Sequence, residues 1–99
     1  MPRPERVRIG ALEYGVEWDD PEDGDRYGEC DIVAQVIRVS GKIPGDRQRE
    51  GLLHEVLHAV ADRYLADEID ERVVRQLAAG LLDWMVANLD AMRWIVEEK

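Results

Sequence analysis

The chain has 99 residues, of which 45% are hydrophobic, and its formal net charge is −9 at pH 7. This length and composition predict one globular domain over residues 1–99 rather than a disordered chain. The negative charge argues against nucleic acid and anionic membranes as partners, because phosphate binding needs clustered Lys and Arg.

Short β-strands are predicted in the amino-terminal half. Residues 7–9 and 12–18 are rich in β-favouring side chains with partial alternation, and the acidic segment 19–25 is typical of a solvated turn. One or two further strands are predicted at 28–32 and 35–39. The alternation of side chains in 35–39 is typical of a half-buried antiparallel strand.

Two long helices are predicted in the carboxyl-terminal half. The first follows the break at 40–45, with Asp46 as its N-cap, and ends near Leu65. Because apolar residues surround most of its middle, we expect it to be central, between a sheet and another helix. The second begins around residues 67–70 and ends at Asn88. Its apolar positions recur at helical spacing: Val74, Leu77, Ala78, Leu81, Leu82 and Met85.

A short last helix is predicted after Asn88, with Asp90 as its cap. It carries Trp94, which we expect to contact a partner chain and so to make the protein a homodimer. The predicted fold class is therefore α+β. A small antiparallel amino-terminal sheet of three or four strands packs on the central first helix and on a second long helix.

The first of these helices contains the pentad His54-Glu55-Val56-Leu57-His58. Residues four apart lie on one face of a helix, so both imidazoles can bind one metal ion, while Glu55 is offset toward a metal-bound water. This H-E-x-x-H pattern predicts a zinc site with Glu55 as general base. The chain has only two His residues, and both lie in the pentad, so a chance occurrence of this pattern is rare. The alternative to a metal site is an amphipathic core helix that carries two incidental histidines.

A zinc site needs a third protein ligand, which must here be Asp, Glu or Cys. Asp62 is eight residues from His54, or ~12 Å along the helix, and is too distant. Cys30 lies in a strand-like segment and is expected to be a small core residue. The remaining candidates follow the first helix: Asp67, Glu68, Asp70 and Glu71.

Helix phase favours Glu71 among these candidates. It shares a stripe with Val74 and Ala78, which should face the first helix, whereas Glu68 shares a solvated stripe with basic residues. Asp70 points inward with a shorter side chain, and Asp67 is best placed as the N-cap. The predicted ligands are therefore His54, His58 and Glu71, with Asp70 and Glu68 as alternatives.

The pentad with an acidic ligand on a following helix resembles the gluzincin branch of the zincin metallopeptidases. Residues 52–59 and 70–82 are similar to short H-E-x-x-H proteins of phages and bacteria, which are distant relatives of the ImmA/IrrE-type peptidases. In such sequences a Glu precedes a Val by three residues and a Leu-Ala pair by six, as Glu71 does here. The resemblance covers about residues 27–88, and it implies a peptidase. It also implies a His or Tyr that stabilises the oxyanion, for which this chain offers Tyr14, Tyr27 and Tyr64.

The predicted function is a zinc-dependent metallopeptidase that cleaves a protein or peptide, with zinc-activated water and Glu55 as general base. Strand 35–39 is expected to be the sheet edge along which an extended substrate pairs. The alternative is a zinc-stabilised binding module with weak or no hydrolysis, in which zinc holds the helices together.

Location follows from features that the sequence lacks. No apolar run approaches the ~20 residues of a membrane span, and residues 1–6 have no apolar core of a signal peptide. The single cysteine, Cys30, excludes an internal disulfide framework. We therefore expect a cytoplasmic protein.

Overall fold

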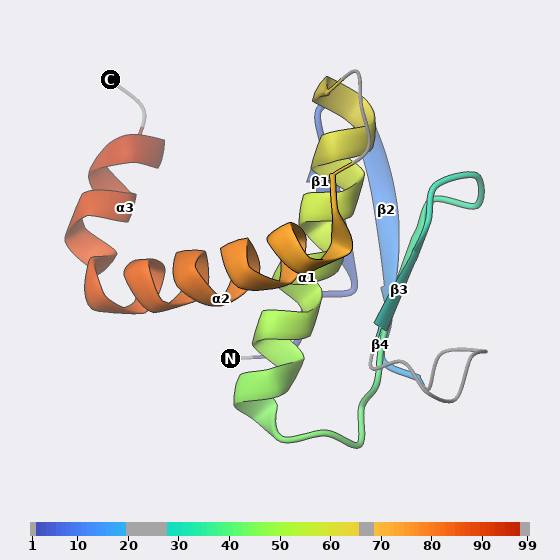
Figure 1. The fold of residues 1–99 in the computed structure, drawn as a ribbon, viewed down its shortest axis with the longest axis horizontal. Coiled ribbons are helices and arrows are strands. Elements are labelled where there is room, and N and C mark those ends of the chain that lie inside the picture. Colours follow the sequence, from blue (N-terminus) through green and yellow to red (C-terminus); the bar gives the residue numbers. More distant parts are fainter. Residues whose placement is uncertain (1, 20–27, 66–68, 98–99) are drawn as a thin grey trace.

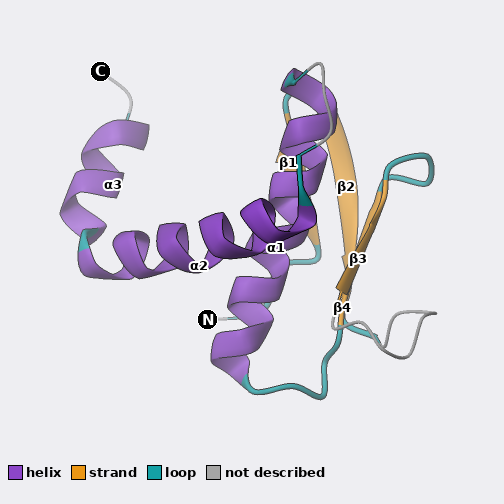
Figure 2. Ribbon diagram, viewed as in Figure 1, coloured by secondary structure: helices purple, strands orange, loops and turns teal. Residues whose placement is uncertain are grey.

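A four-stranded sheet precedes three helices in the computed structural model, which describes residues 2–19, 28–65 and 69–97 (Figures 1 and 2). The α+β class is confirmed, whereas most of the predicted acidic turn at 19–25 lies outside the described residues. The elements are β1 (Arg6–Ile9), β2 (Leu12–Glu17), β3 (Gly28–Asp31), β4 (Val36–Val39), α1 (Gly45–Tyr64), α2 (Glu71–Ala87) and α3 (Leu89–Val96).

The sheet has the strand order β1-β2-β4-β3 and is mixed, so the prediction of an antiparallel sheet is wrong in one pairing. The pairs β1–β2 and β3–β4 are antiparallel, but β2 and β4 are parallel, with Gly15 beside Val36 and Glu17 beside Arg38. Because β3 is the outer strand and turns back into β4, β4 returns in the same direction as β2. The strand expected at the sheet edge is thus internal, and β3 is an edge.

The core forms between this sheet and α1. In β4, Ile37 and Val39 are fully buried while Val36 and Arg38 are less so, which confirms the predicted alternation. Ala59 of α1 is also fully buried, and its small side chain allows the helix to pack closely on the strands. On its other side α1 contacts α2, so the predicted central position of the motif helix is confirmed.

The first helix begins slightly earlier than predicted. Its N-cap is Pro44 rather than Asp46, and Asp46 lies in the first turn, where its negative charge favours the positive end of the helix dipole. The Gln48 side-chain amide donates to the carbonyls of Gly41 and Ile43. These bonds hold the preceding turn against the helix, and they fix its start without a capping side chain.

The caps of the other two helices also differ from prediction. Asp70 is the N-cap of α2, and its Oδ1 accepts from the backbone N–H of Arg72 at 2.7 Å. Asp67, which was expected in this role, lies outside the described residues. Asn88 ends α2 as predicted, but Asn88 rather than Asp90 is also the N-cap of α3.

The chain leaves the sheet along α2. The buried residues of α2 are Val74 and Ala78, both in its first half, and α3 has none. We call residues 79–97 the helical arm, since Figure 1 shows the far part of α2 and all of α3 extending away from the sheet. Within the residues described, none of the helices has the length and apolar character needed to cross a membrane.

Candidate metal centre

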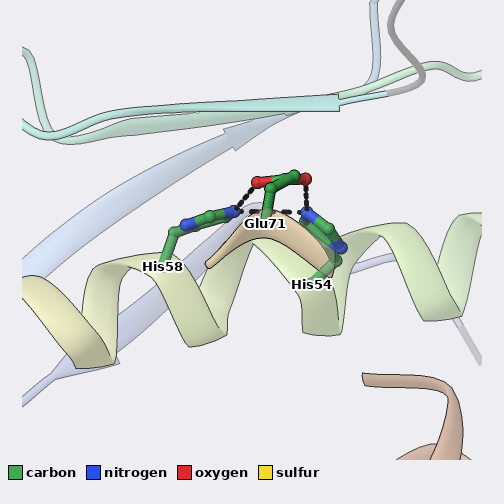
Figure 3. Close-up of side chains that lie close together, drawn as sticks. All are labelled: His54, His58 and Glu71. Carbon is green, nitrogen blue, oxygen red and sulfur yellow. Dashed lines mark hydrogen bonds and ion pairs between the residues drawn. The ribbon is translucent and has the colours of Figure 1, made fainter. Parts of the chain in front are cut away.

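Two imidazoles lie side by side on α1, one helical turn apart. The Nε2 atoms of His54 and His58 are 3.2 Å apart, and their ring centroids are 4.9 Å apart (Figure 3). The spacing of four residues puts both rings on one face of the helix, as the sequence predicted. At this separation one ring nitrogen can donate a hydrogen bond to the other, and the same two nitrogens lie close enough together to bind one cation.

Glu71, the first residue of α2, meets both imidazoles. Its Oε1 is 2.7 Å from His54 Nε2, and its Oε2 is 2.8 Å from His58 Nε2 (Figure 3). The buried side chains of Val74 and Ala78 fix the phase of α2 on α1. Since Glu71 lies one turn before Val74, this phase directs its carboxylate at the histidines. The structure thus brings together the three residues that were predicted as ligands.

The geometry of this group fits a divalent metal ion. One ligand atom from each of His54, His58 and Glu71 can be chosen so that all lie within 4.8 Å of one another. At zinc–nitrogen distances of ~2.0–2.1 Å, two ligands of a tetrahedral ion are ~3.3–3.4 Å apart. The observed 3.2 Å between the imidazole nitrogens is close to this separation, whereas the Glu71 oxygens, at 2.7 and 2.8 Å, lie at hydrogen-bond distance and would move outward by about half an ångström around an ion. Nitrogen and oxygen donors of this kind suit zinc, and they also suit other divalent transition metals.

Electrostatics favours the metal-binding form of His54. Burial lowers the pKa of this imidazole below its usual 6.5, and the charges of His58 and Arg75 act in the same direction. The carboxylate of Glu71 opposes them, but burial is the largest cause. A lowered pKa keeps the imidazole neutral at pH 7, and only the neutral ring can donate a lone pair to a metal.

Glu55 lies next to the three clustered residues without belonging to them. Its side chain is 9% exposed, and its Oε2 is 3.9 Å from His54 Nε2. On its other side it reaches β3, where a Cβ on Gly28 would be 3.0 Å from the same oxygen. The absence of a side chain at Gly28 therefore gives Glu55 its place between α1 and the edge strand.

Two of these neighbours were missed from the sequence. Arg75 is four residues after Glu71, and the sequence offered it as part of a solvated face or as an ion-pair partner of Glu71 on a partly exposed turn, but not as a neighbour of His54. Gly28 gave no signal, because its proximity to Glu55 depends on how the sheet packs on α1.

The other ligand candidates lie elsewhere. Asp70 is occupied as the N-cap of α2, and Glu68 is outside the described residues. Cys30 is partly buried against the core, as expected, and burial, followed by the charge of Glu55, raises the pKa of its thiol to about 12. A thiol of this kind stays protonated at neutral pH, which disfavours metal binding.

The tyrosines considered for an oxyanion do not join the site in the described part of the chain. Tyr14 is buried in the core, where desolvation raises the pKa of its phenol. Tyr64 lies at the last turn of α1, with its hydroxyl beside Gly10. Tyr27 lies outside the described residues.

Comparison of the chain with models of protein families, with curated proteins and with solved structures finds no match. The functional argument therefore depends on the geometry of the site itself.

Proposed function

We propose that this protein is a zinc-dependent hydrolase of the metallopeptidase kind, with His54, His58 and Glu71 as metal ligands. The observation that carries the proposal is the convergence of two imidazole nitrogens and one carboxylate, with a second carboxylate, that of Glu55, 3.9 Å from one of the nitrogens. A structural site needs no general base next to its ligands, whereas a hydrolytic site does.

Each residue has a separate role in this proposal. Bound zinc would supply Lewis-acid chemistry, which acidifies water and polarises a carbonyl group. Glu55 accepts the proton of the attacking water and passes it to the leaving amine. Its small exposed fraction keeps bulk water from competing for that proton.

We propose a protein or peptide in extended conformation as substrate, bound along β3. Among the described residues this strand pairs only with β4, and it begins at Gly28, next to Glu55. A peptide that adds to its free edge by backbone hydrogen bonds would run past the catalytic carboxylate. The proposed setting is the cytoplasm, since Cys30, the one cysteine of the sequence, is free.

One observation favours a second candidate, a zinc-stabilised binding module. Within the described residues, the Tyr14 side chain is buried in the core and the Tyr64 hydroxyl lies beside Gly10, which leaves neither phenol exposed next to the imidazoles to stabilise an oxyanion. In this second function, zinc joins α1 to the start of α2 through Glu71, and its binding free energy contributes to folding. Hydrolysis would then be weak or absent.

Metal analysis of protein purified without chelators tests the shared part of both proposals. We expect one zinc per chain by mass spectrometry, and loss of that zinc in His58→Ala. The matched control is Gln48→Ala, which changes a residue of α1 outside the site and should leave the metal content unchanged. Protein that lacks zinc, or that holds another metal in its place, contradicts the proposal.

Glu55→Gln then separates the enzyme from the binding module. This variant keeps the shape of the side chain and removes the base, so zinc content should remain while peptide hydrolysis falls by ~10²–10⁴. A mass-spectrometric screen with extended peptides provides the substrate for this measurement. If cleavage persists in Glu55→Gln, the assigned mechanism is wrong; if wild-type protein cleaves nothing but loses thermal stability on zinc removal, the binding module is supported.

A further inference from the structure

Large apolar side chains are exposed along the whole of α2 and α3. Trp84 is 43% exposed and Trp94 is 78% exposed, although tryptophan is a side chain that proteins usually cover. The others along α2 and α3 are Val73, Leu77, Val86, Leu89, Ile95 and Val96. These two helices therefore present an apolar surface that the rest of the described chain leaves open.

Part of this surface has a regular spacing. Val73, Leu77, Gly80 and Trp84 follow one another at intervals of four, three and four residues, which places them on one stripe of α2. This α2 stripe is separate from the face of Val74 and Ala78 that packs on α1. Intervals of this kind are typical of a helix that packs against a second helix along its length.

Gly80 at the centre of the stripe faces open space in the described part of the chain. A glycine in a helix interior lowers helix stability, and a Cβ placed on Gly80 would meet no atom within 4 Å. Its small size is thus not required by any contact in the described structure. A glycine between Leu77 and Trp84 allows another helix to approach the backbone closely.

We propose that a second copy of this chain covers the α2 stripe, with the two α2 helices antiparallel about a twofold axis near Gly80. In this arrangement Leu77 of each copy lies opposite Trp84 of the other, because the two positions are almost equally distant from the axis. The same patch then serves both copies, as a twofold interface requires. The α3 helices flank the crossing and add Trp94 and its apolar neighbours to the covered surface.

The exposed area is sufficient for such a dimer. Val86 points to the other side of α2, and the exposed fractions of the remaining seven apolar side chains of α2 and α3 correspond to at most roughly 800 Å², similar to the ~800 Å² that each partner contributes to a standard interface. α3 itself has only eight residues and no buried side chain, so it gains little stability within one copy. Contact with a second copy would supply the packing that this helix lacks.

Charge favours a second copy over a highly charged partner. Residues 71–96 carry three acidic and three basic side chains, so the net charge of −9 resides in the rest of the chain. Two copies can therefore bring their α2 and α3 helices together without strong repulsion at the contact, and a strongly cationic or anionic partner would find no complementary field there.

Sedimentation velocity between about 1 and 100 µM tests the assembly. We expect a species of twice the 11.4 kDa chain mass whose share rises with concentration. Leu77→Glu and Trp94→Asp should each raise the dissociation constant at least tenfold, while Val33→Asp, at a 95% exposed position in the turn between β3 and β4, should not change it. Circular dichroism confirms that each variant is folded. A chain that stays monomeric at all concentrations, or that forms complexes only with a different protein, overturns the proposal.

A cross-linking measurement tests the twofold axis independently. In a Cys30→Ser background, Gly80→Cys places a thiol near the axis, so a short bis-maleimide should link two copies at low micromolar concentration. Val33→Cys in the same background is the control and should link at least tenfold more slowly. Equal rates for the two variants would mean random collision and overturn the proposed pairing, even if a dimer forms.

Discussion

The two ends of α2 lie in different surroundings, although both are rich in apolar residues. At its start, Val74 and Ala78 are fully buried, and the carboxylate oxygens of Glu71 lie 2.7 and 2.8 Å from the Nε2 atoms of two imidazoles of α1. At its far end, Trp84 and Val86 are exposed and no residue is buried. One end thus completes the fold and the candidate metal centre, and the other end presents an uncovered surface.

This difference teaches that helical periodicity identifies a helix without showing what covers it. The start of α2 is fixed by α1, by the Asp70 cap and by the contacts of Glu71, so its stability comes from within the chain. At the far end, the Asn88 side chain donates to the Trp84 carbonyl, but the exposed apolar side chains there gain free energy from burial only if another surface covers them. Variants placed at the two ends should therefore affect different properties.

The largest expected effect is on metal affinity. Glu71→Ala removes one of three proposed ligands, which corresponds to about a third of the ~10–16 kcal/mol typical of structural zinc, or roughly a thousandfold weaker binding. Asp83→Ala removes a carboxylate from the exposed end of the same helix and should leave the affinity unchanged. Competition with a chromophoric chelator measures both values. Similar affinities in the two variants would contradict the assignment of the site to one end of α2.

A second prediction compares a thiol of the sheet with one on the arm. Burial raises the pKa of Cys30 from 9.0 to about 12, so at pH 8.5 this thiol should react with iodoacetamide roughly 100–1000 times more slowly than an exposed one. The comparison variant is Val86→Cys in a Cys30→Ser background, since Val86 is exposed on α2. Mass spectrometry of quenched samples gives both rates, and equal rates would mean that Cys30 is not covered.

The same shift predicts a dependence of stability on pH. The unfolded chain loses the Cys30 proton above about pH 9, whereas the folded chain keeps it until about pH 12. The contribution of this group to stability is therefore complete below pH 9, and it falls progressively as the pH rises from 9 to 12. Urea denaturation should show a smaller decrease in this range for Cys30→Ser than for wild type.

Local patterns in the sequence were sufficient for much of this architecture. The i,i+4 spacing of His54 and His58 predicted their shared helix face, and helix phase relative to Val74 and Ala78 directed Glu71 toward them. Both inferences use distances of one or two helical turns, over which backbone geometry is fixed. For that reason the sequence could predict that these three residues lie close together. That they bind a metal ion stays a prediction.

Long-range arrangement could not be predicted in the same way. The parallel pairing of β2 with β4 joins strands separated by the whole of β3, and alternation within 35–39 is the same for an edge strand and an internal one. Leu77 shares the apolar periodicity of α2 with Val74 and Ala78, yet it is 44% exposed while they are fully buried. Periodicity shows which side chains are apolar, whereas only the packed chain shows how wide a stripe is covered.

A further prediction concerns the free energy of unfolding in dilute solution. Val74→Ala removes two methyl groups from a fully buried position and should lower the free energy of unfolding by about 2 kcal/mol. Leu77→Ala, one turn away on the exposed α2 stripe, should change it by less than ~0.5 kcal/mol when the chain is monomeric. Urea denaturation at low concentration measures both, and an equal loss would mean that the stripe is covered within one copy.

The smallest expected effect comes from the cap that starts α2. Asp70→Ala removes the acceptor for the Arg72 backbone N–H, which should lower stability by about 1 kcal/mol and loosen the first turn that holds Glu71. Zinc affinity should fall a few-fold as a result, since the ligand remains but is less well oriented. Asp90→Ala on α3 is the matched control, because Asp90 lies in a first turn whose N-cap makes no side-chain hydrogen bond. Urea denaturation and chelator competition measure the free energy of unfolding and the zinc affinity of both variants. If Asp90→Ala lowers the free energy of unfolding as much as Asp70→Ala does, the Asp70 cap contributes nothing specific to the start of α2.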